Sequence, residues 1–262
     1  MNINRDGILI TCLQADANLY KIKGKQYQII QTLKPYNFLL NIIGRIDGKY
    51  SITKFLELKN GDLVFFPYHY GISFYKKNTK DNKYSNIYRY HKGDGYLCDV
   101  CEIGNNQFAF AFKYKYTLQF FDMNSKKITK ILQYFSFSDS TNGLILMNNK
   151  DLLVAGQSSI YIVDIEKKEV YKKFNLYSNG NLESIYRLTN NILLVGYQHN
   201  YIEQIEYDEI KKELKIISKI YKNKDSNPIE FISLFNNDLI VAPYKNFDKK
   251  GGSLIIYKLK NK

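Results

Sequence analysis

The sequence predicts an all-β fold, a β-propeller of six recognisable four-stranded units. Three observations lead to this prediction: a repeat of propeller-blade length, alternation of apolar and polar residues inside each repeat, and turn residues between the alternating segments. The chain is 262 residues long, and its 45% hydrophobic and 15% aromatic residues exclude a disordered protein.

The repeat is the apolar core of a strand, preceded in five of its six copies by Asn at a fixed offset. A degenerate first copy begins at Ile3, 55 residues before the second. The later copies are 45, 44, 41 and 46 residues apart and begin at Leu58, Ile103, Met147, Leu188 and Leu234. A period of about 40–45 residues is that of one four-stranded blade.

Each repeat has room for four strands. In the second repeat, Lys59-Asn60-Gly61 is typical of a hairpin turn, because Asn and Gly tolerate positive φ. Strands are expected there at 50–58, 63–66, 72–75 and 87–90. In the fourth repeat they are expected at 143–147, 151–155, 160–165 and 170–174. Residues 206–222 come closest to a helical pattern, but residues 215–220 within them fit a strand as easily as a helix.

We expect a single β-propeller domain over residues 1–262. Its units cover approximately 1–33, 50–91, 95–135, 142–176, 182–222 and 228–262, with an insertion at 34–49. The first unit enters near the end of its first strand, and the last stops after its third. We therefore expect either a piece of a longer product with a seventh blade or an open ring.

These residues resemble WD-repeat proteins from about residue 3 to 260. The resemblance lies in strand order, spacing and the Asp-Leu-Leu-Val-Ala-Gly second strand at 151–156. The chain has no tryptophan and no Gly-His dipeptide, so it is a degenerate version in which aromatic-Asp or Ile-Asp endings replace Trp-Asp. The resemblance implies that loops between second and third strands share one face with the connections between blades. The other hairpins lie on the opposite face.

Sorted in this way, the second-to-third loops carry Tyr and His residues. Aromatic side chains on loops over a rigid scaffold are typical of a protein-recognition surface. The alternative is chance, because the chain has 24 tyrosines and some must pack inward. The predicted partner-binding residues are Tyr68, His69, Tyr114, Tyr116, Tyr197, His199 and Tyr244.

The third-to-fourth hairpins carry lysines, beginning with residues 76–83 in the second repeat, and the chain has a net charge of +13. A ring of lysines could bind an anionic membrane or nucleic acid, or it could simply be solvated and protect the sheet edges. The few arginines are scattered, which disfavours bidentate phosphate recognition. The predicted polyanion-binding residues are Lys126, Lys127, Lys167, Lys168, Lys172 and Lys173.

Enzyme signatures are missing: the sequence has neither a Gly-rich phosphate loop after a strand nor a G-x-S-x-G elbow. We therefore expect no catalytic residues, cofactor or metal. Cys98 and Cys101 form a C-x-x-C, but an expected strand places them on opposite sides, which favours structural thiols. No apolar run is long enough to cross a membrane and no secretory signal is evident, so we expect a cytoplasmic or alternatively nuclear protein.

Together these observations predict a non-catalytic protein-interaction scaffold that binds a protein or peptide partner through its Tyr/His-rich loop face. One alternative is polyanion binding through the lysine-rich face. A second is a propeller enzyme of hydrolase or lyase type, because such enzymes scatter their residues over several blades.

Overall fold

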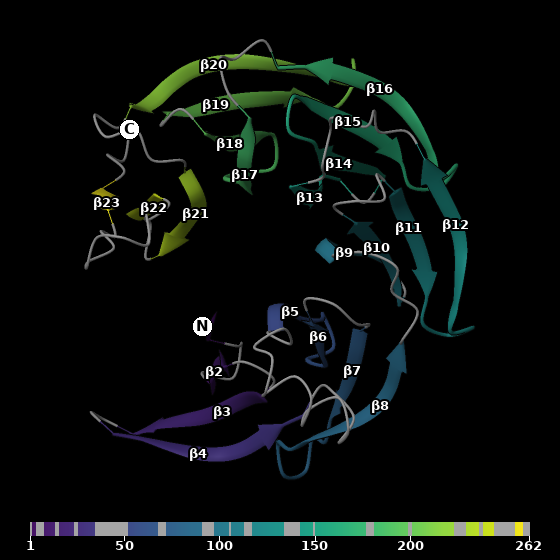
Figure 1. The fold of residues 1–262 in the computed structure, drawn as a ribbon, viewed down its shortest axis with the longest axis vertical. Coiled ribbons are helices and arrows are strands. Elements are labelled where there is room, and N and C mark those ends of the chain that lie inside the picture. Colours follow the sequence, from purple (N-terminus) through teal and green to yellow (C-terminus); the bar gives the residue numbers. More distant parts are fainter. Residues whose placement is uncertain are drawn as a thin grey trace. The chain divides into compact units, whose positions relative to one another are not determined.

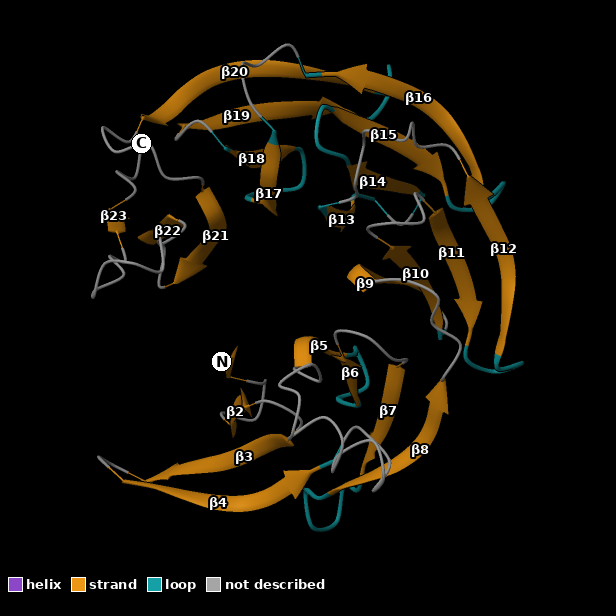
Figure 2. Ribbon diagram, in the orientation of Figure 1, coloured by secondary structure: helices purple, strands orange, loops and turns teal. Residues whose placement is uncertain are grey.

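A computed structural model describes residues 2–3, 8–13, 16–23, 26–34, 52–67, 72–90, 97–104, 106–112, 117–133, 142–148, 150–176, 181–198, 201–222, 229–235, 238–243 and 255–258. The chain divides into two compact units, Met1–Leu97 and Cys98–Lys262. Every described element is a strand, and turns join the strands (Figure 2). We number the six sheets blades 1 to 6 in chain order.

The N-terminal unit contains two four-stranded antiparallel sheets with strands in chain order. Blade 1 consists of β1 (Asn2–Ile3), β2 (Ile8–Leu13), β3 (Asp16–Lys23) and β4 (Gln26–Leu33). Blade 2 consists of β5 (Ile52–Glu57), β6 (Leu63–Pro67), β7 (Ile72–Lys77) and β8 (Tyr84–Tyr90). One buried cluster, which includes Leu19 and Phe65, joins the two sheets.

The C-terminal unit contains three four-stranded sheets and one with three described strands. Blade 3 consists of β9 (Leu97–Gly104), β10 (Gln107–Phe112), β11 (Thr117–Asp122) and β12 (Lys127–Gln133). Blade 4 consists of β13 (Gly143–Leu146), β14 (Asp151–Ala155), β15 (Ser159–Asp164) and β16 (Glu169–Asn175).

Blade 5 consists of β17 (Leu182–Arg187), β18 (Ile192–Tyr197), β19 (Tyr201–Asp208) and β20 (Glu213–Lys222). Blade 6 consists of β21 (Ile229–Phe235), β22 (Asp238–Pro243) and β23 (Ile255–Lys258). Within this unit the first strands β9, β13 and β17 lie on the inside of a curve, and the fourth strands β12, β16 and β20 lie on its outside (Figure 1).

The strand predictions for the fourth repeat are confirmed, because each observed strand lies within one residue of its predicted bounds. Residues 213–222 form a strand rather than a helix. The C-x-x-C lies in β9, as expected, and both cysteines are half-buried. Of the predicted insertion at 34–49, only Lys34 belongs to the described residues.

The core lies between neighbouring sheets, so central strands are buried on both faces. In β14, Leu152 and Val154 pack into the cluster shared with blade 3, whereas Leu153 and Ala155 pack into the cluster shared with blade 5. This explains why the second strands are continuous apolar runs in the sequence, while the outer strands alternate.

The pairing of third and fourth strands is interrupted by a β-bulge in all five complete blades. Each bulge adds one residue to the fourth strand, at Ile30, Ile87, Thr129, Tyr171 and Ile217. Bulges in edge strands increase the local twist and hinder pairing with a foreign strand, so each outer edge is protected. The fifth blade has a second bulge near the end of β20.

Four third-to-fourth hairpins share one turn, which begins at Asn78, Asp122, Asp164 and Asp208. The side-chain Oδ1 of this first residue accepts a hydrogen bond from a backbone amide two or three residues later; for Asp164 the donor is Lys167, at 2.9 Å. The Asp endings found in the sequence therefore close turns. The fifth residue has a left-handed backbone, and it is Asn82, Lys126, Lys168 or Lys212.

Candidate functional site

Backbone hydrogen bonds distinguish the two ends of the blade 4 sheet. The loop between β14 and β15 lies beside the connection to blade 5, because the Gln157 carbonyl accepts a hydrogen bond from the Leu182 amide at 2.7 Å. The two hairpin turns lie together at the other end, where the Lys150 carbonyl accepts from the Ile165 amide at 2.9 Å. We call these the loop end and the hairpin end.

At the loop end of blade 5, two tyrosines form the base of the loop between β18 and β19. The rings of Tyr197 and Tyr201 stack with centroids 4.6 Å apart, and both residues are buried. The Tyr197 hydroxyl donates a hydrogen bond to Oε2 of Glu203 at 2.8 Å. The ammonium of Lys219 lies 3.5 Å from Oε1 of Glu203 and 4.6 Å from the centroid of the Tyr201 ring.

This geometry corrects the prediction that Tyr197 is a partly exposed contact residue, because its side chain is 0% exposed. Its large ring fills the core between blades 4 and 5, and the buried Glu203 satisfies its hydroxyl. Sequence analysis missed Glu203 and Lys219. A signal was present, since Glu203 interrupts an otherwise apolar strand start at Tyr201-Ile202.

The other predicted partner-binding residues lie outside the described residues. The strands around them are described, and they place these residues between second and third strands. Tyr68 and His69 follow β6, Tyr114 and Tyr116 lie between β10 and β11, His199 lies between β18 and β19, and Tyr244 follows β22.

The six predicted polyanion-binding lysines lie at the hairpin end of blades 3 and 4 or in the strands that leave it. Lys126 and Lys127 are exposed in the hairpin that joins β11 to β12. Lys167 and Lys168 lie in the equivalent turn of blade 4, and Lys172 and Lys173 lie in β16.

Several of these ammonium groups contact neighbouring side chains. Lys168 donates a hydrogen bond to the Thr129 hydroxyl of blade 3 at 2.9 Å and lies 5.7 Å from the Phe120 ring centroid. Lys172 pairs with Glu213 of blade 5 at 3.1 Å. Lys168 therefore links the third-to-fourth hairpin of blade 4 to β12, the outer strand of blade 3. Lys172, in the outer strand β16 of blade 4, links this strand to Glu213 at the start of β20 in blade 5. The charges of both lysines therefore serve contacts between blades.

The two remaining lysines of blade 4 also have neighbours. The ammonium of Lys167 lies 3.9 Å from Glu169, an exposed pair that contributes little to stability. Lys173 lies over the ring of Tyr161, 5.3 Å from its centroid. A bound polyanion would compete with these contacts.

The positive charge is also unevenly distributed along the chain. Residues 1–97 contain 15 Lys and Arg against 7 Asp and Glu, whereas residues 98–222 contain 16 against 14. All six predicted lysines therefore belong to a nearly neutral part of the chain, and the excess of cations lies mainly in the N-terminal unit.

A buried carboxylate joins blades 4 and 5 at the hairpin end. Asp151 is buried at the start of β14, and its Oδ2 accepts a hydrogen bond from the Tyr207 hydroxyl at 2.8 Å. The same oxygen pairs with the ammonium of Lys212. Burial, followed by the hydrogen bond and negative charge of Asp151, raises the pKa of Tyr207 well above its usual range. Asp151 is more than a turn residue, because it links two blades.

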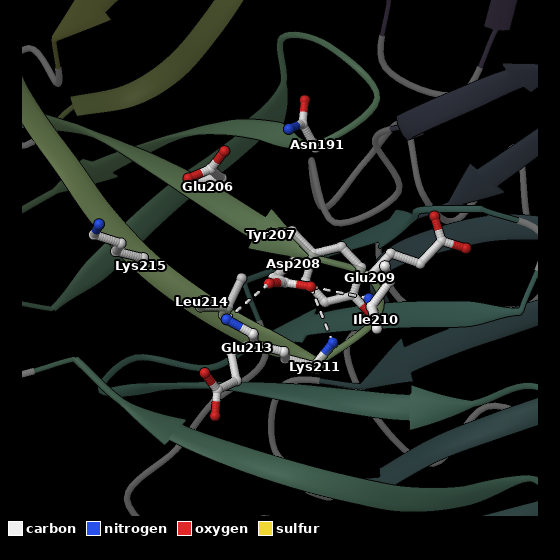
Figure 3. Close-up of a pocket in the computed structure, with 10 residues that line it drawn as sticks. All are labelled: Asn191, Glu206, Tyr207, Asp208, Glu209, Ile210, Lys211, Glu213, Leu214 and Lys215. Atoms are coloured by element: carbon white, nitrogen blue, oxygen red, sulfur yellow. Dashed lines mark hydrogen bonds and ion pairs between the residues drawn. The ribbon is translucent and has the colours of Figure 1, made fainter.

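An open hollow of about 730 Å³ lies at the hairpin between β19 and β20 (Figure 3). Two of its four acidic residues have structural partners: Asp208 closes the turn by accepting from the amides of Ile210 and Lys211, and Glu213 pairs with Lys172. Asp208 and Glu213 therefore stabilise the hairpin and its contact with blade 4.

Among the described residues, no group of three or more His, Cys, Asp and Glu side chains is arranged to hold a metal ion. A helix able to cross a membrane is likewise not found in the part of the chain that the structure describes. Burial raises the pKa of the Cys12 thiol to about 11, which keeps this cysteine protonated and unreactive at neutral pH.

These sheets, their strand order and their repeat length define a β-propeller of the WD40 type, as the sequence predicts. The β-propeller domain of Cps50 (Swd1) from Myceliophteria thermophila is similar, with a TM-score of 0.72 and 13% identity over 98% of this chain and 85% of that domain. The WD40 β-propeller domain of Doa1 has a TM-score of 0.66 and 13% identity, over 97% of this chain and 76% of that chain.

Sequence comparison adds little to the structural likeness. No family model matches this sequence. Protein Ycf2 from Anthoceros angustus is 33% identical over 138 residues, which are 51% of this chain but only 6% of that protein. At 13% identity the structural relatives establish the fold alone.

Proposed function

We propose that this chain is a non-catalytic scaffold that binds a protein or peptide partner at its loop end. The observation that carries the proposal is the support beneath the loop of residues 198–200. Tyr197 and Tyr201, the residues that border this loop, stack on each other, and the buried Glu203 and its Lys219 partner hold them in place. A loop held at both ends by buried contacts loses little entropy when it binds.

The partner-binding residues in this proposal are the remaining Tyr and His residues predicted in the loops between second and third strands. Tyr197 acts beneath the surface as a support. The contacts with the partner come from Tyr68, His69, Tyr114, Tyr116, His199 and Tyr244.

The lysine contacts favour the protein-scaffold proposal over polyanion binding at the six predicted lysines. Lys168 and Lys172 link neighbouring blades, and residues 98–222 are close to neutral. A catalytic alternative has no supporting group of residues in the described part of the chain.

Affinity capture from extracts of the source cells, with quantitative mass spectrometry, tests the proposal. The double variant Tyr114→Ala/His199→Ala should reduce recovery of a specific partner at least about tenfold, because truncated interface anchors each contribute about 2 kcal/mol or more. The melting temperature should stay close to that of the unchanged protein.

Tyr171→Ala is the matched control, since Tyr171 is 60% exposed on β16. It removes an aromatic side chain away from the loop face and should leave capture unchanged. Equal recovery by the loop variant and the unchanged protein would refute binding at the loop end.

A further inference from the structure

We propose that the junction of blades 1 and 2 forms a second docking surface, for an acidic peptide segment that also carries aliphatic side chains. We call this surface the basic rim, and it consists of Ile29, Ile30, Lys76, Lys80 and Lys83. The proposal rests on the scaffold function above, and it names the chemistry of a partner at a site away from the loop end.

The hairpin between β7 and β8 is strongly cationic. Residues 76–83 contain four lysines and a single acidic residue, Asp81. Lys76, Lys80 and Lys83 are exposed. This hairpin belongs to the N-terminal unit, in which Lys and Arg outnumber Asp and Glu by 15 to 7.

The nearby carboxylates close turns through backbone amides. Asp81 accepts a hydrogen bond from the Lys83 amide at 3.1 Å. Asp62 accepts from the Lys77 amide at 2.8 Å through Oδ1 and from the Asn60 side chain at 2.8 Å through Oδ2. In blades 4 and 5, by contrast, Lys172 and Lys212 pair with carboxylates. The cationic hairpin is therefore the better candidate for an acidic partner.

Exposed aliphatic residues of β4 lie at the same junction between blades as this hairpin. The Gln31 side chain of β4 forms two hydrogen bonds with the backbone of Tyr84. Its Nε2 donates to the Tyr84 carbonyl at 2.7 Å, and its Oε1 accepts from the Tyr84 amide at 2.8 Å. Ile30 precedes Gln31 and Lys83 precedes Tyr84, so both flank one junction, where the end of β4 meets the start of β8 (Figure 1).

The isoleucines at this junction are exposed, Ile29 at 54% and Ile30 at 36%. Ile30 is the bulge residue of β4, the outer strand of blade 1. Exposed aliphatic groups and exposed ammonium groups at one junction match a segment in which carboxylates and aliphatic residues are interspersed.

The same residues fit nucleic acid and membranes less well. Single-stranded nucleic acid needs exposed aromatic faces for stacking, but Tyr84 is buried and Tyr88 is half-buried. The guanidinium of Arg89, another group that can stack on a base, already donates a hydrogen bond to the Lys34 carbonyl at 3.0 Å. The turn between β7 and β8, residues 78–82, is polar and includes an acidic residue, so this turn has no aliphatic side chain to insert into a bilayer.

Fluorescence anisotropy with a labelled peptide of alternating Glu and Leu tests the proposal on the full chain. Lys80→Glu/Lys83→Glu should weaken binding at least about tenfold, because two attractive charges become repulsive. The matched control, Lys127→Glu/Lys130→Glu, makes the same change in net charge on exposed lysines of blade 3 and should weaken binding much less.

Ile29→Ser/Ile30→Ser should also weaken binding of this peptide, without changing how steeply binding depends on salt. An all-Glu peptide should bind more weakly than the Glu/Leu peptide and should be insensitive to the isoleucine substitutions. The loop-end variant Tyr114→Ala/His199→Ala should bind the Glu/Leu peptide normally, so failure at the rim is distinguishable from failure of the loop-end proposal.

Equal losses from the two lysine pairs would mean that bulk charge attracts the peptide, which overturns the proposal. It would also be overturned if the unchanged protein does not bind the peptide. Vesicles of phosphatidylcholine with phosphatidylserine, and an oligothymidylate, serve as competitors. Tighter binding of either one through Lys80 and Lys83 would assign the rim to a membrane or to nucleic acid instead.

Discussion

Gly143 of β13 lies so close to Ile185 of β17 that a Cβ atom at position 143 would be 2.7 Å from Cγ2 of Ile185. The first strands of blades 4 and 5 meet at this point. The next residue of β13 contacts blade 3: the Leu144 amide donates a hydrogen bond to Oδ2 of Asp99, at 2.8 Å. The spacing of these inner strands therefore depends on a residue without a side chain.

Substitution of this glycine should destabilise the C-terminal unit. Gly143→Ala should lower the free energy of unfolding by about 1–3 kcal/mol, because the added methyl group forces Ile185 or the strand to move. Ile185→Ala removes the obstructing atom at a cost of its own. In a double-mutant cycle measured by chemical denaturation, the two changes together should cost clearly less than their sum. Additive losses would show that the contact does not limit the strand spacing.

A second prediction concerns the left-handed residue of the third-to-fourth hairpins. Lys126 has φ of 56°, a conformation that is costly for residues other than Gly, Asn and Asp. Lys126→Gly should therefore raise the free energy of unfolding by roughly 0.5–1 kcal/mol, after the greater chain entropy of glycine is allowed for. Lys127→Gly, one residue later in β12, should instead be destabilising. A loss of stability in both variants would contradict this account.

The raised pKa of Tyr207 predicts a dependence of stability on pH. Burial and the Asp151 carboxylate favour the neutral phenol in the folded protein, so the folded state keeps its proton where the unfolded chain releases it. Stability from this residue is fully present below the usual tyrosine pKa of about 10 and falls as the pH rises above it.

The unchanged protein should therefore lose stability relative to Tyr207→Phe above about pH 10, by up to about 1.4 kcal/mol per pH unit. Below that pH the variant should be the less stable protein by a constant amount, because Asp151 loses a hydrogen bond. Denaturant titrations of both proteins between neutral and alkaline pH measure the difference. A difference that does not change with pH would rule out the linkage.

The support beneath the loop of blade 5 leads to a fourth prediction. Tyr197→Phe keeps the stacked ring but removes a hydrogen bond to the buried Glu203, and should cost about 1–3 kcal/mol of stability. Partner capture at temperatures where the variant stays folded should be nearly unchanged. Tyr171→Phe, on an exposed side chain, should be neutral in both measurements. A large loss of capture by folded Tyr197→Phe would mean that the Tyr197 hydroxyl contacts the partner directly.

The sequence alone was sufficient for the architecture. The repeat spacing, the alternation of the outer strands and the Asp residues at the ends of third strands are local properties, since they reflect burial, pleating and turn closure within a few residues. That is why the bounds of β13–β16 were predictable to within one residue, and why a strand was recognisable at Cys98 and Cys101.

Only the tertiary structure decided what individual side chains do, because their partners belong to other blades. Lys172 meets Glu213 and Asp151 meets Lys212, residues 41 and 61 positions away in the sequence. Tyr197 lies at the end of a strand next to a loop, where periodicity does not specify whether a ring turns outward or stacks on Tyr201. Packing between sheets buries that ring, and no pattern along one strand contains that information.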